Sequence, residues 1–388
     1  MKHLRQCNLF IHDEIIINIL NRLPLKSLAR FKCIAYNWQK CIAEIYRCRL
    51  GFPEPYLIGF FCVEKRLRSR FFFTSKESPL LIGTNLDKSI DFIGERVYIV
   101  GSSNGFLLCN KLRSRQRVYY VYNPATRQRL DVPKTRIRMN DPYVGFTCKV
   151  DEDHGIVSFT IVRYVIRKHY ESSITIESYS SETTVWIANN AIHDLLYPLQ
   201  PSRDENYLSS RCVINGVFCW IDNFGQGMTF MIVSGATYAF SRVKKCFWGL
   251  TYPQPGCMIY PGFHFLGLSG GELCFASKGW TIPCWRLNNF PSRDAQWVWK
   301  YNVDVVTIIE KCGEDFGLGG GNVQNIVFHP VFPDILYLQI NGKVISYGVK
   351  TSTVQLDYDF GEAGRKTKHY KLFSYEWPQW PRLKKTIN

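Results

Sequence analysis

Two short segments match patterns that other folds use for catalysis or phosphate binding. Residues 267–271 read Gly-Leu-Ser-Gly-Gly, the Gly-x-Ser-x-Gly pattern that exposes a nucleophilic serine in α/β-hydrolases. That chemistry requires a strand before the serine and a helix after it, whereas residues 272–276 are typical of a strand. The glycine-rich segment 317–321 lacks the Lys-Ser/Thr pair of a phosphate-binding loop, and we interpret it as a mobile loop. The sequence therefore predicts neither a nucleophilic Ser269 nor any other catalytic residue.

The cysteines and histidines are not spaced as metal ligands. The 14 cysteines are scattered without a Cys-x-x-Cys pair, and the eight histidines supply no matching partners. This usage is typical of reduced core cysteines in an intracellular protein, so we expect no metal and no cofactor. Because no stretch approaches the roughly 18 apolar residues of a membrane span, we expect a protein of the nucleus, the cytoplasm or both.

Positive charge is concentrated in one part of the chain. Residues 65–138 hold 16 Lys/Arg against 5 Asp/Glu, whereas residues 139–388 hold 23 against 22. Side chains alternate sides along a strand, so Arg113, Arg115 and Arg117 could project from one face, with Arg127 and Arg129 added from a neighbouring strand. A clustered cationic face attracts acidic partners and speeds their encounter. We therefore predict that these three arginines bind a partner protein with an acidic segment.

The basic stretch 65–73 allows a second interpretation. This stretch combines arginines with the aromatic run Phe71–Phe73, a composition that grips nucleic acid in some proteins. Cations also keep an edge strand from pairing with other molecules. We favour the edge strand and do not expect nucleic acid as the partner.

The N-terminal 50 residues predict three short helices. Apolar residues recur at helical spacing in the first segment, at Ile15, Ile16, Ile19, Leu20 and Leu23. Pro24 ends this helix and suits the first turn of the next one. Trp38, Cys41, Ile42 and Ile45 continue the pattern in a third. So small a module needs an appended domain or a partner to cover its apolar surface, and periodicity alone does not distinguish a helical cap from a docking module.

The sequence of residues 19–34, together with Trp38, resembles that of the F-box family. In that family the module inserts apolar residues into a Skp1-like adaptor, which links to a cullin and a RING protein. The resemblance implies an F-box over residues 1–50, with adaptor contacts at Ile11, Ile15, Ile19, Leu20, Leu23, Pro24, Leu25, Leu28, Phe31 and Trp38. One departure is Ile11-His12, where the family has Leu-Pro; the loss of that proline weakens or reshapes the expected contact.

Residues 51–388 are predicted to form an all-β domain. Apolar, strand-like runs are separated by turn signals such as Asn104-Gly105, Asn123-Pro124, Asn215-Gly216, Gly270-Gly271 and Asn341-Gly342. No long helical period is visible after residue 50. Recurring strand–turn–strand units favour a β-propeller, although their irregular spacing leaves a large β-sandwich open.

Several patches resemble the F-box-associated domain of plant F-box proteins. They are residues 101–109, 122–127, 180–186 and 328–338, with Thr184 where the family has Gly. The resemblance implies a kelch-like β-propeller that binds a substrate protein, with the segment around Phe373–Tyr375 completing a blade. The whole chain then resembles a non-catalytic substrate adaptor of an SCF-type ubiquitin ligase. The alternative is a nucleic-acid-binding propeller with a helical cap.

Overall fold

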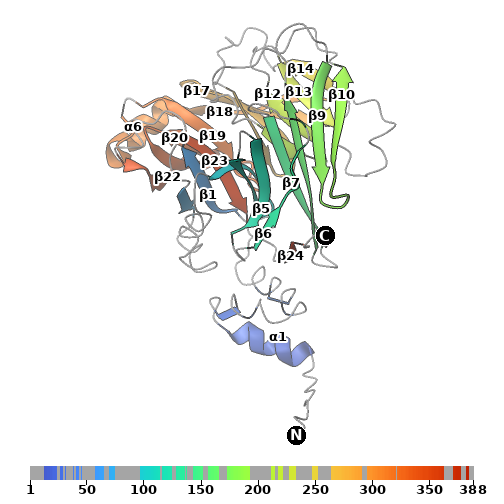
Figure 1. Ribbon diagram of the computed structural model, residues 1–388. Coiled ribbons are helices and arrows are strands. Elements are labelled where there is room, and N and C mark those ends of the chain that lie inside the picture. Colours follow the sequence, from blue (N-terminus) through green and yellow to red (C-terminus); the bar gives the residue numbers. More distant parts are fainter. Residues whose placement is uncertain are drawn as a thin grey trace, which may run out of the picture.

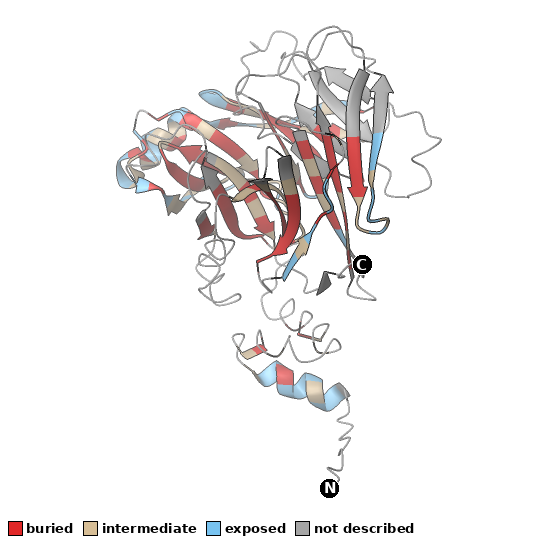
Figure 2. Cartoon of the chain, viewed as in Figure 1, coloured by how far each residue is buried: buried red, intermediate tan, exposed pale blue. Residues whose placement is uncertain are grey.

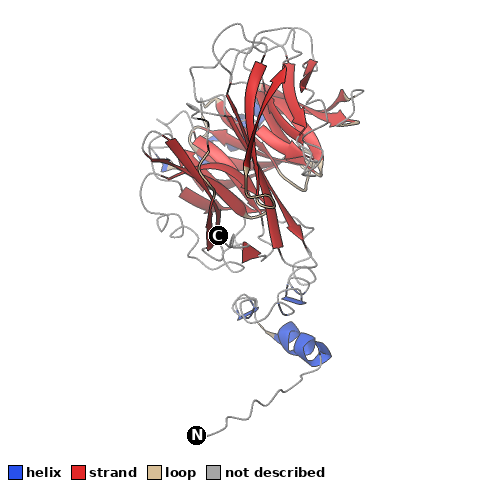
Figure 3. Cartoon of the chain, turned by 45° about the vertical axis from the view of Figure 1, so that its right-hand side comes forward, coloured by secondary structure: helices blue, strands red, loops and turns tan. Residues whose placement is uncertain are grey.

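The computed structural model of the chain is shown in Figure 1. It describes residues 13–23, 27–28, 31, 38, 41–42, 45, 57–64, 70–74, 97–113, 116–124, 128–135, 137, 143–151, 156–165, 173–192, 211–214, 217–221, 227–232, 247–251, 264–290, 295–319, 321–361, 370–376 and 382–383. Strands dominate these residues (Figure 3). The segment Asn215-Gly216 lies outside them.

The described residues form six sheets, and five of these are meanders, in which consecutive strands pair in chain order. The first contains β3 (Val97–Ser103), β4 (Phe106–Arg113), β5 (Gln116–Asn123) and β6 (Gln128–Asp131). The second contains β7 (Tyr143–Asp151), β8 (Ile156–Val165), β9 (Ser173–Ser180) and β10 (Trp186–Ile192), joined by β24 (Arg382–Leu383). The third contains β11 (Arg211–Ile214), β12 (Val217–Ile221), β13 (Gly227–Ile232) and β14 (Phe247–Thr251).

The last two meanders follow the same plan. One contains β15 (His264–Ser269), β16 (Glu272–Ser277), β17 (Thr281–Asn288) and β18 (Gln296–Asp304). The other contains β19 (Val323–Phe328), β20 (Ile335–Ile340), β21 (Lys343–Gly348) and β22 (Thr353–Asp359). The chain is therefore a β-propeller, as the recurring units predicted, and the β-sandwich alternative is wrong.

The sixth sheet joins the two ends of the propeller. It pairs β1 (Leu57–Glu64) with β2 (Arg70–Phe73) on one side and with β23 (Tyr370–Glu376) on the other. Phe60 lies opposite Ser374 and Phe61 opposite Phe373 in an antiparallel register. The prediction that the Phe373–Tyr375 segment completes a blade is confirmed. Because β1 pairs with β23 in this sheet, the ring closes when residues more than 300 positions apart meet.

Paired positive-φ residues make the tight hairpins that the sequence predicted. Asn104 and Gly105 have φ angles of 48° and 76°, and Asn341 and Gly342 have 49° and 73°. Two consecutive residues with positive φ are the signature of the type I′ turn, whose twist matches that of the flanking strands. The Asn-Gly pairs are therefore structural turns.

A helix, α6, lies among the described residues of the β-domain, where the sequence predicted none. Helix α6 (Val305–Phe316) begins at Asp304, whose carboxylate accepts hydrogen bonds from the backbone N–H groups of Val306 and Thr307. It ends at Gly317, which has a left-handed φ of 61°, and the N–H of Leu318 donates to the carbonyl of Gly313. This arrangement satisfies the last carbonyls of the helix. The interpretation of this glycine-rich segment as a mobile loop is wrong at Gly317, which is a helix cap.

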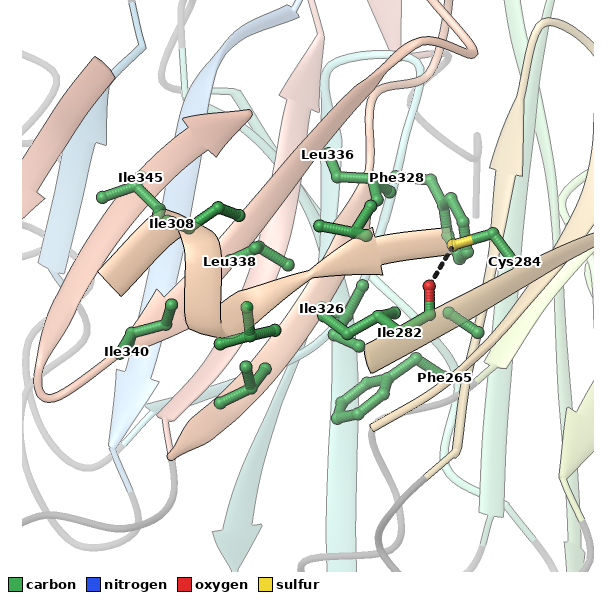
Figure 4. Packing of buried hydrophobic residues seen from close by; sticks show 14 of the residues in the cluster. Phe265, Ile282, Cys284, Ile308, Ile326, Phe328, Leu336, Leu338, Ile340 and Ile345 are labelled. Carbon is green, nitrogen blue, oxygen red and sulfur yellow. Dashed lines mark hydrogen bonds between the residues drawn. The ribbon is translucent and has the colours of Figure 1, made fainter. Parts of the chain in front are cut away.

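Buried apolar side chains fill the spaces between neighbouring sheets (Figure 2). Figure 4 shows one such cluster, where Phe265 and Ile282 of one sheet meet Ile326 and Phe328 of the next, and where Ile308 of α6 lies near Ile345. Six of the eight cysteines whose side chains the structure describes are buried, which fits the prediction of core cysteines. The sheets are therefore packed face to face around a ring, and function must lie in what projects from it.

Candidate functional site

The N-terminal module has a small apolar core of its own. Helix α1 (Asp13–Arg22) places Leu20 in a cluster with Leu28, Ile42 and Ile45, all at most 5% exposed. Around them lie the partly buried Ile16, Leu23, Phe31, Trp38 and Cys41. The rings of Phe31 and Trp38 are 5.9 Å apart, an ordinary aromatic contact. Of the predicted adaptor contacts, Leu20 and Leu28 are thus occupied in holding this module together.

The outward side of α1 carries isoleucines that nothing in the described residues covers. Ile15 and Ile19 are 51% and 50% exposed, and Ile17 is 38% exposed. Ile15 and Ile19 are one helical turn apart and form a single apolar stripe. Of the other predicted contacts, Ile11, Pro24 and Leu25 lie outside the described residues, as do most positions of the predicted second and third helices.

The segment Gly101–Gly105 joins three neighbouring sheets. Ser102 Oγ donates to the carbonyl of Ser374 at 2.5 Å in the closing sheet. Asn104 Nδ2 donates to the carbonyl of Cys148 at 2.8 Å, and Ser103 Oγ accepts from the N–H of Cys148 at 3.0 Å in the next sheet. A Cβ on Gly101 would approach Phe146 to 2.8 Å, so only glycine fits there. This motif is structural, as its turn chemistry predicted.

Ser269 likewise makes a hydrogen bond between neighbouring sheets. Its hydroxyl donates to the carbonyl of His329 at 2.6 Å, and the residue is 1% exposed. Gly270 and Gly271 form the turn into β16, so no helix follows the serine. The interpretation of this segment as something other than a hydrolase site is confirmed.

The predicted basic residues are not arranged along one strand. Strand β4 ends at Arg113, β5 starts at Gln116, and Arg117 pairs with Leu112 across the hairpin. Arg115 lies outside the described residues. Alternation along a single strand therefore does not bring these arginines to one face.

Arg129 does not extend this group, contrary to expectation. It pairs with Tyr122, five positions along β5 from Arg117, or roughly 17 Å. Its Nε donates to Asp131 at 2.7 Å, and its guanidinium lies 4.1 Å from the ring centre of Tyr120. Arg127 lies outside the described residues.

A buried ion pair holds the connection between the first two meanders. Arg163 of β8 and Glu177 of β9 are each 1% exposed and form a direct ion pair. Arg163 Nη2 also donates to the carbonyl of Ile137, and the N–H of Ile137 donates to Glu177. Trp186 lies against Arg163 and donates from Nε1 to the carbonyl of Pro133 at 2.7 Å. These contacts fix Ile137 against β8 and β9, and Pro133 against β10.

Two carboxyl groups have raised pKa values. Burial raises the pKa of Asp357 to about 7, opposed by hydrogen bonds from Ser346. Burial also raises the pKa of Glu376 to about 7, opposed by the N–H of Asn104, which donates to it. They belong to different sheets, β22 and β23, and are not arranged as an acid–base pair.

Large apolar side chains are exposed where sequence reasoning did not look. Trp280 is 60% exposed and Trp299 57%, beside Val306 at the start of α6, which is 39% exposed. No local pattern marks them, because Trp280 precedes a strand and Trp299 lies within one. Exposure of this kind depends on which face the folded sheet leaves open.

The described residues contain no group of three or more His, Cys, Asp or Glu arranged to hold a metal ion. In the same part of the chain, no helix is both long and apolar enough to cross a membrane.

Comparison with known proteins gives one family and several relatives. Residues 81–374 match the family model described as F-box protein At3g26010-like, beta-propeller. F-box protein At3g26010 of Arabidopsis thaliana is 24% identical over 374 residues, covering 89% of this chain and 79% of that protein. The putative F-box/kelch-repeat protein At4g22430 of the same plant is 26% identical over 387 residues, covering 93% and 82%.

A more similar segment is shared with F-box protein At5g49610 of Arabidopsis thaliana. It is 36% identical over 134 residues, which cover 32% of this chain and 33% of that protein. The family match spans most of the propeller, from ahead of β3 into β23. The chain therefore belongs to the β-propeller family of the At3g26010-like F-box proteins.

Proposed function

We propose that the chain is the substrate-recruiting subunit of an SCF-type ubiquitin ligase. Its N-terminal module binds a Skp1-like adaptor, which connects it to a cullin and a RING protein, and its propeller holds a protein target. The subunit supplies no catalytic group. It accelerates transfer by raising the effective concentration of the target near the ubiquitin-charged enzyme.

The observation that carries this proposal is the exposed stripe on α1. Ile15 and Ile19 remain half exposed although the module already has a core of Leu20, Leu28, Ile42 and Ile45. Full burial of an isoleucine side chain contributes about 1.5–3 kcal/mol, so covering the exposed half of each contributes about 1 kcal/mol. A partner that covers both, together with neighbouring apolar surface, gains specific affinity. The F-box names of the relatives indicate which partner to test.

The test uses α1 variants that leave the module core intact. Ile15→Asp and Ile19→Asp each place a carboxylate on the exposed stripe, so the desolvation of that charge opposes docking. Asn18→Asp and Asn21→Asp are matched controls, because both asparagines are exposed on the same helix. Titration calorimetry of the full chain with a purified Skp1-like adaptor gives the affinity, and the thermal melting curve of each variant checks the fold.

We expect the isoleucine variants to weaken adaptor binding by at least about tenfold, which corresponds to about 1.4 kcal/mol. The asparagine controls should stay near the original affinity. Equal affinity for all four variants would exclude the α1 stripe as the adaptor contact. Substituting Leu28 would not be informative, because that residue is fully buried in the module and its loss would unfold it.

The basic region is a second part of the proposal. Arg113, Arg115 and Arg117 flank or lie within the β4–β5 connection. The concentration of Lys/Arg in residues 65–138 supports attraction of an acidic partner to this part of the propeller. The expected contribution is to the association rate more than to the lifetime of the complex.

A further inference from the structure

Helix α6 and the strand before it present an apolar and acidic surface to solvent. We define the α6 surface by Trp280, Trp299, Val306, Glu310 and Glu314, all exposed. Figure 1 places α6 at the rim of the propeller, and Figure 2 shows exposed residues along its outer side. None of these residues contributes to the joints between sheets described above.

A hydrogen bond links Trp280 to the start of α6, and Trp299 lies in the strand that leads into this helix. The N–H of Val305 donates to the carbonyl of Trp280 at 2.8 Å, which puts Trp280 beside the first turn of α6. Trp299 lies upstream on β18, and its indole N–H donates to Asn302, two residues before the helix cap Asp304. Exposed tryptophans are costly to leave in water and are over-represented among the residues that dominate protein interfaces.

The acidic part has no explanation within the propeller. Val306, Glu310 and Glu314 are spaced four residues apart, so they form one stripe about 12 Å long on the outer side of α6. Glu314 and Asp315 lie in the last turn, where the helix dipole disfavours negative charge. Lys311 is the basic residue of this outer side, and among the described residues Glu310, Glu314 and Asp315 form no ion pair. The carboxylates therefore cost the helix stability without an ion-pair partner among the described residues.

We propose that the α6 surface docks a basic segment of a protein partner, with an apolar side chain on the Trp280–Val306 end and Lys or Arg along Glu310 and Glu314. Charge decides the occupant, because the acidic stripe attracts a cationic partner locally. It does so although the chain as a whole carries a formal net charge of +16. Tryptophan also attracts Lys and Arg through its ring face. In the context of the proposed function, this partner is the target or a regulator of its capture.

The test selects ligands on the full chain and then maps them. A randomised peptide library is panned on the immobilised chain without any adaptor, and the recovered peptides are measured by fluorescence polarisation. We expect recovered peptides to combine clustered Lys/Arg with an apolar residue. Trp280→Ala should weaken them by about tenfold or more. Glu310→Lys combined with Glu314→Lys should weaken them by a similar factor and flatten the dependence of affinity on salt.

The matched controls lie on the exposed β9–β10 turn. Glu182→Lys makes the same charge reversal at an exposed site, and Val185→Ala removes an apolar side chain that is 53% exposed. Both should leave affinity within about twofold, the level of an energetically neutral contact. No variant should melt at a lower temperature than the original chain, because every substituted side chain is exposed, and the variant with Glu314→Lys should melt slightly higher, because the helix dipole favours positive charge in the last turn.

Three results would overturn the proposal: recovery of acidic peptides, recovery of no basic peptides, or basic peptides whose binding ignores Trp280→Ala and the Glu310/Glu314 reversal. If the chain itself dimerises through this surface, sedimentation will show a concentration-dependent dimer that the charge reversal abolishes, and the foreign partner is then wrong. Adaptor binding, measured with the Ile15 and Ile19 variants, is independent of these outcomes. Failure here therefore leaves the ligase assignment to its own test.

Discussion

Replacing Glu177 by Gln leaves the guanidinium of Arg163 buried beside a neutral side chain. Both groups are 1% exposed, so water cannot compensate the lost charge. Breaking a buried pair by removing one partner costs about 3–5 kcal/mol, because the remaining charge stays uncompensated. Gln can still accept from the N–H of Ile137, which Glu177 accepts now, so the loss reports mainly the ion pair.

Arg163→Met gives the complementary single variant. It leaves Glu177 without its cation, and it also removes the donor to the carbonyl of Ile137 and the cation beside Trp186. We expect a loss of about 3–5 kcal/mol here as well. In the double variant Arg163→Met/Glu177→Met no charge is buried, so its loss should be clearly smaller than the sum of the two single losses.

Urea denaturation followed by tryptophan fluorescence measures these free energies of unfolding. Lys350→Met is the control, because the Lys350–Asp334 pair has 78% and 40% exposed side chains and should contribute less than about 1 kcal/mol. The assignment of this ion pair as the element that fixes Ile137 would be refuted by either of two results. The losses of unfolding free energy in the two single variants could add up in the double variant, or each could be no larger than the loss in the control.

Three further predictions follow from single positions. Thr184 is a β-branched residue with a φ of 57°, where the family turn has Gly, so Thr184→Gly should raise the unfolding free energy by about 0.5–1 kcal/mol; a decrease would show that the turn is unstrained. The folded state holds the Glu376 proton more tightly than the unfolded state, so this group should lower stability by about 1–3 kcal/mol as pH rises from about 4.5 to about 7; Glu376→Gln should reduce the slope and leave the part contributed by Asp357, whose pKa is also raised to about 7, and an unchanged slope would refute the role of Glu376. Arg113→Glu with Arg117→Glu should slow association of an acidic target and reduce its salt dependence while adaptor binding is kept; unchanged rates would return these arginines to the role of a solvated strand edge.

Local chemistry predicted most of the β-domain because turns are local. Asn104-Gly105 and Asn341-Gly342 need positive φ at both positions, and few residue pairs supply it. The strand-like runs between such turns coincide with β3–β5, β8, β9, β16, β20 and β21. Helix α6 was missed, although Asp304 before it and Gly317 after it are standard cap residues. Its β-branched start, Val305-Val306-Thr307, reads as a continuation of the preceding strand.

The candidate surfaces were less predictable because exposure is set by the assembled fold. Leu20 and Ile19 are neighbours in one helical pattern, yet one is buried and the other is half exposed. Arg113 and Arg117 have the even sequence spacing that would place them on one face of a single strand, but they lie on the two different strands of a hairpin. Trp280 and Trp299 are large apolar residues, a type that sequence reasoning would place in the core. Only the position of each residue relative to neighbouring sheets separates core from surface.

Because β1 pairs with β23, the propeller closes only after β23 has been synthesised. β23 leaves the ribosome some 300 residues after β1, so the edge of β1 stays unpaired while the intervening residues emerge. Contacts of such sequence separation form slowly. A chain truncated before residue 370 would carry an N-terminal module on an open ring with an exposed apolar strand, LIGFFCVE, at its edge. Closure of the ring thus reports that translation has passed β23, and chains that stop before it expose a surface that chaperones and proteases recognise.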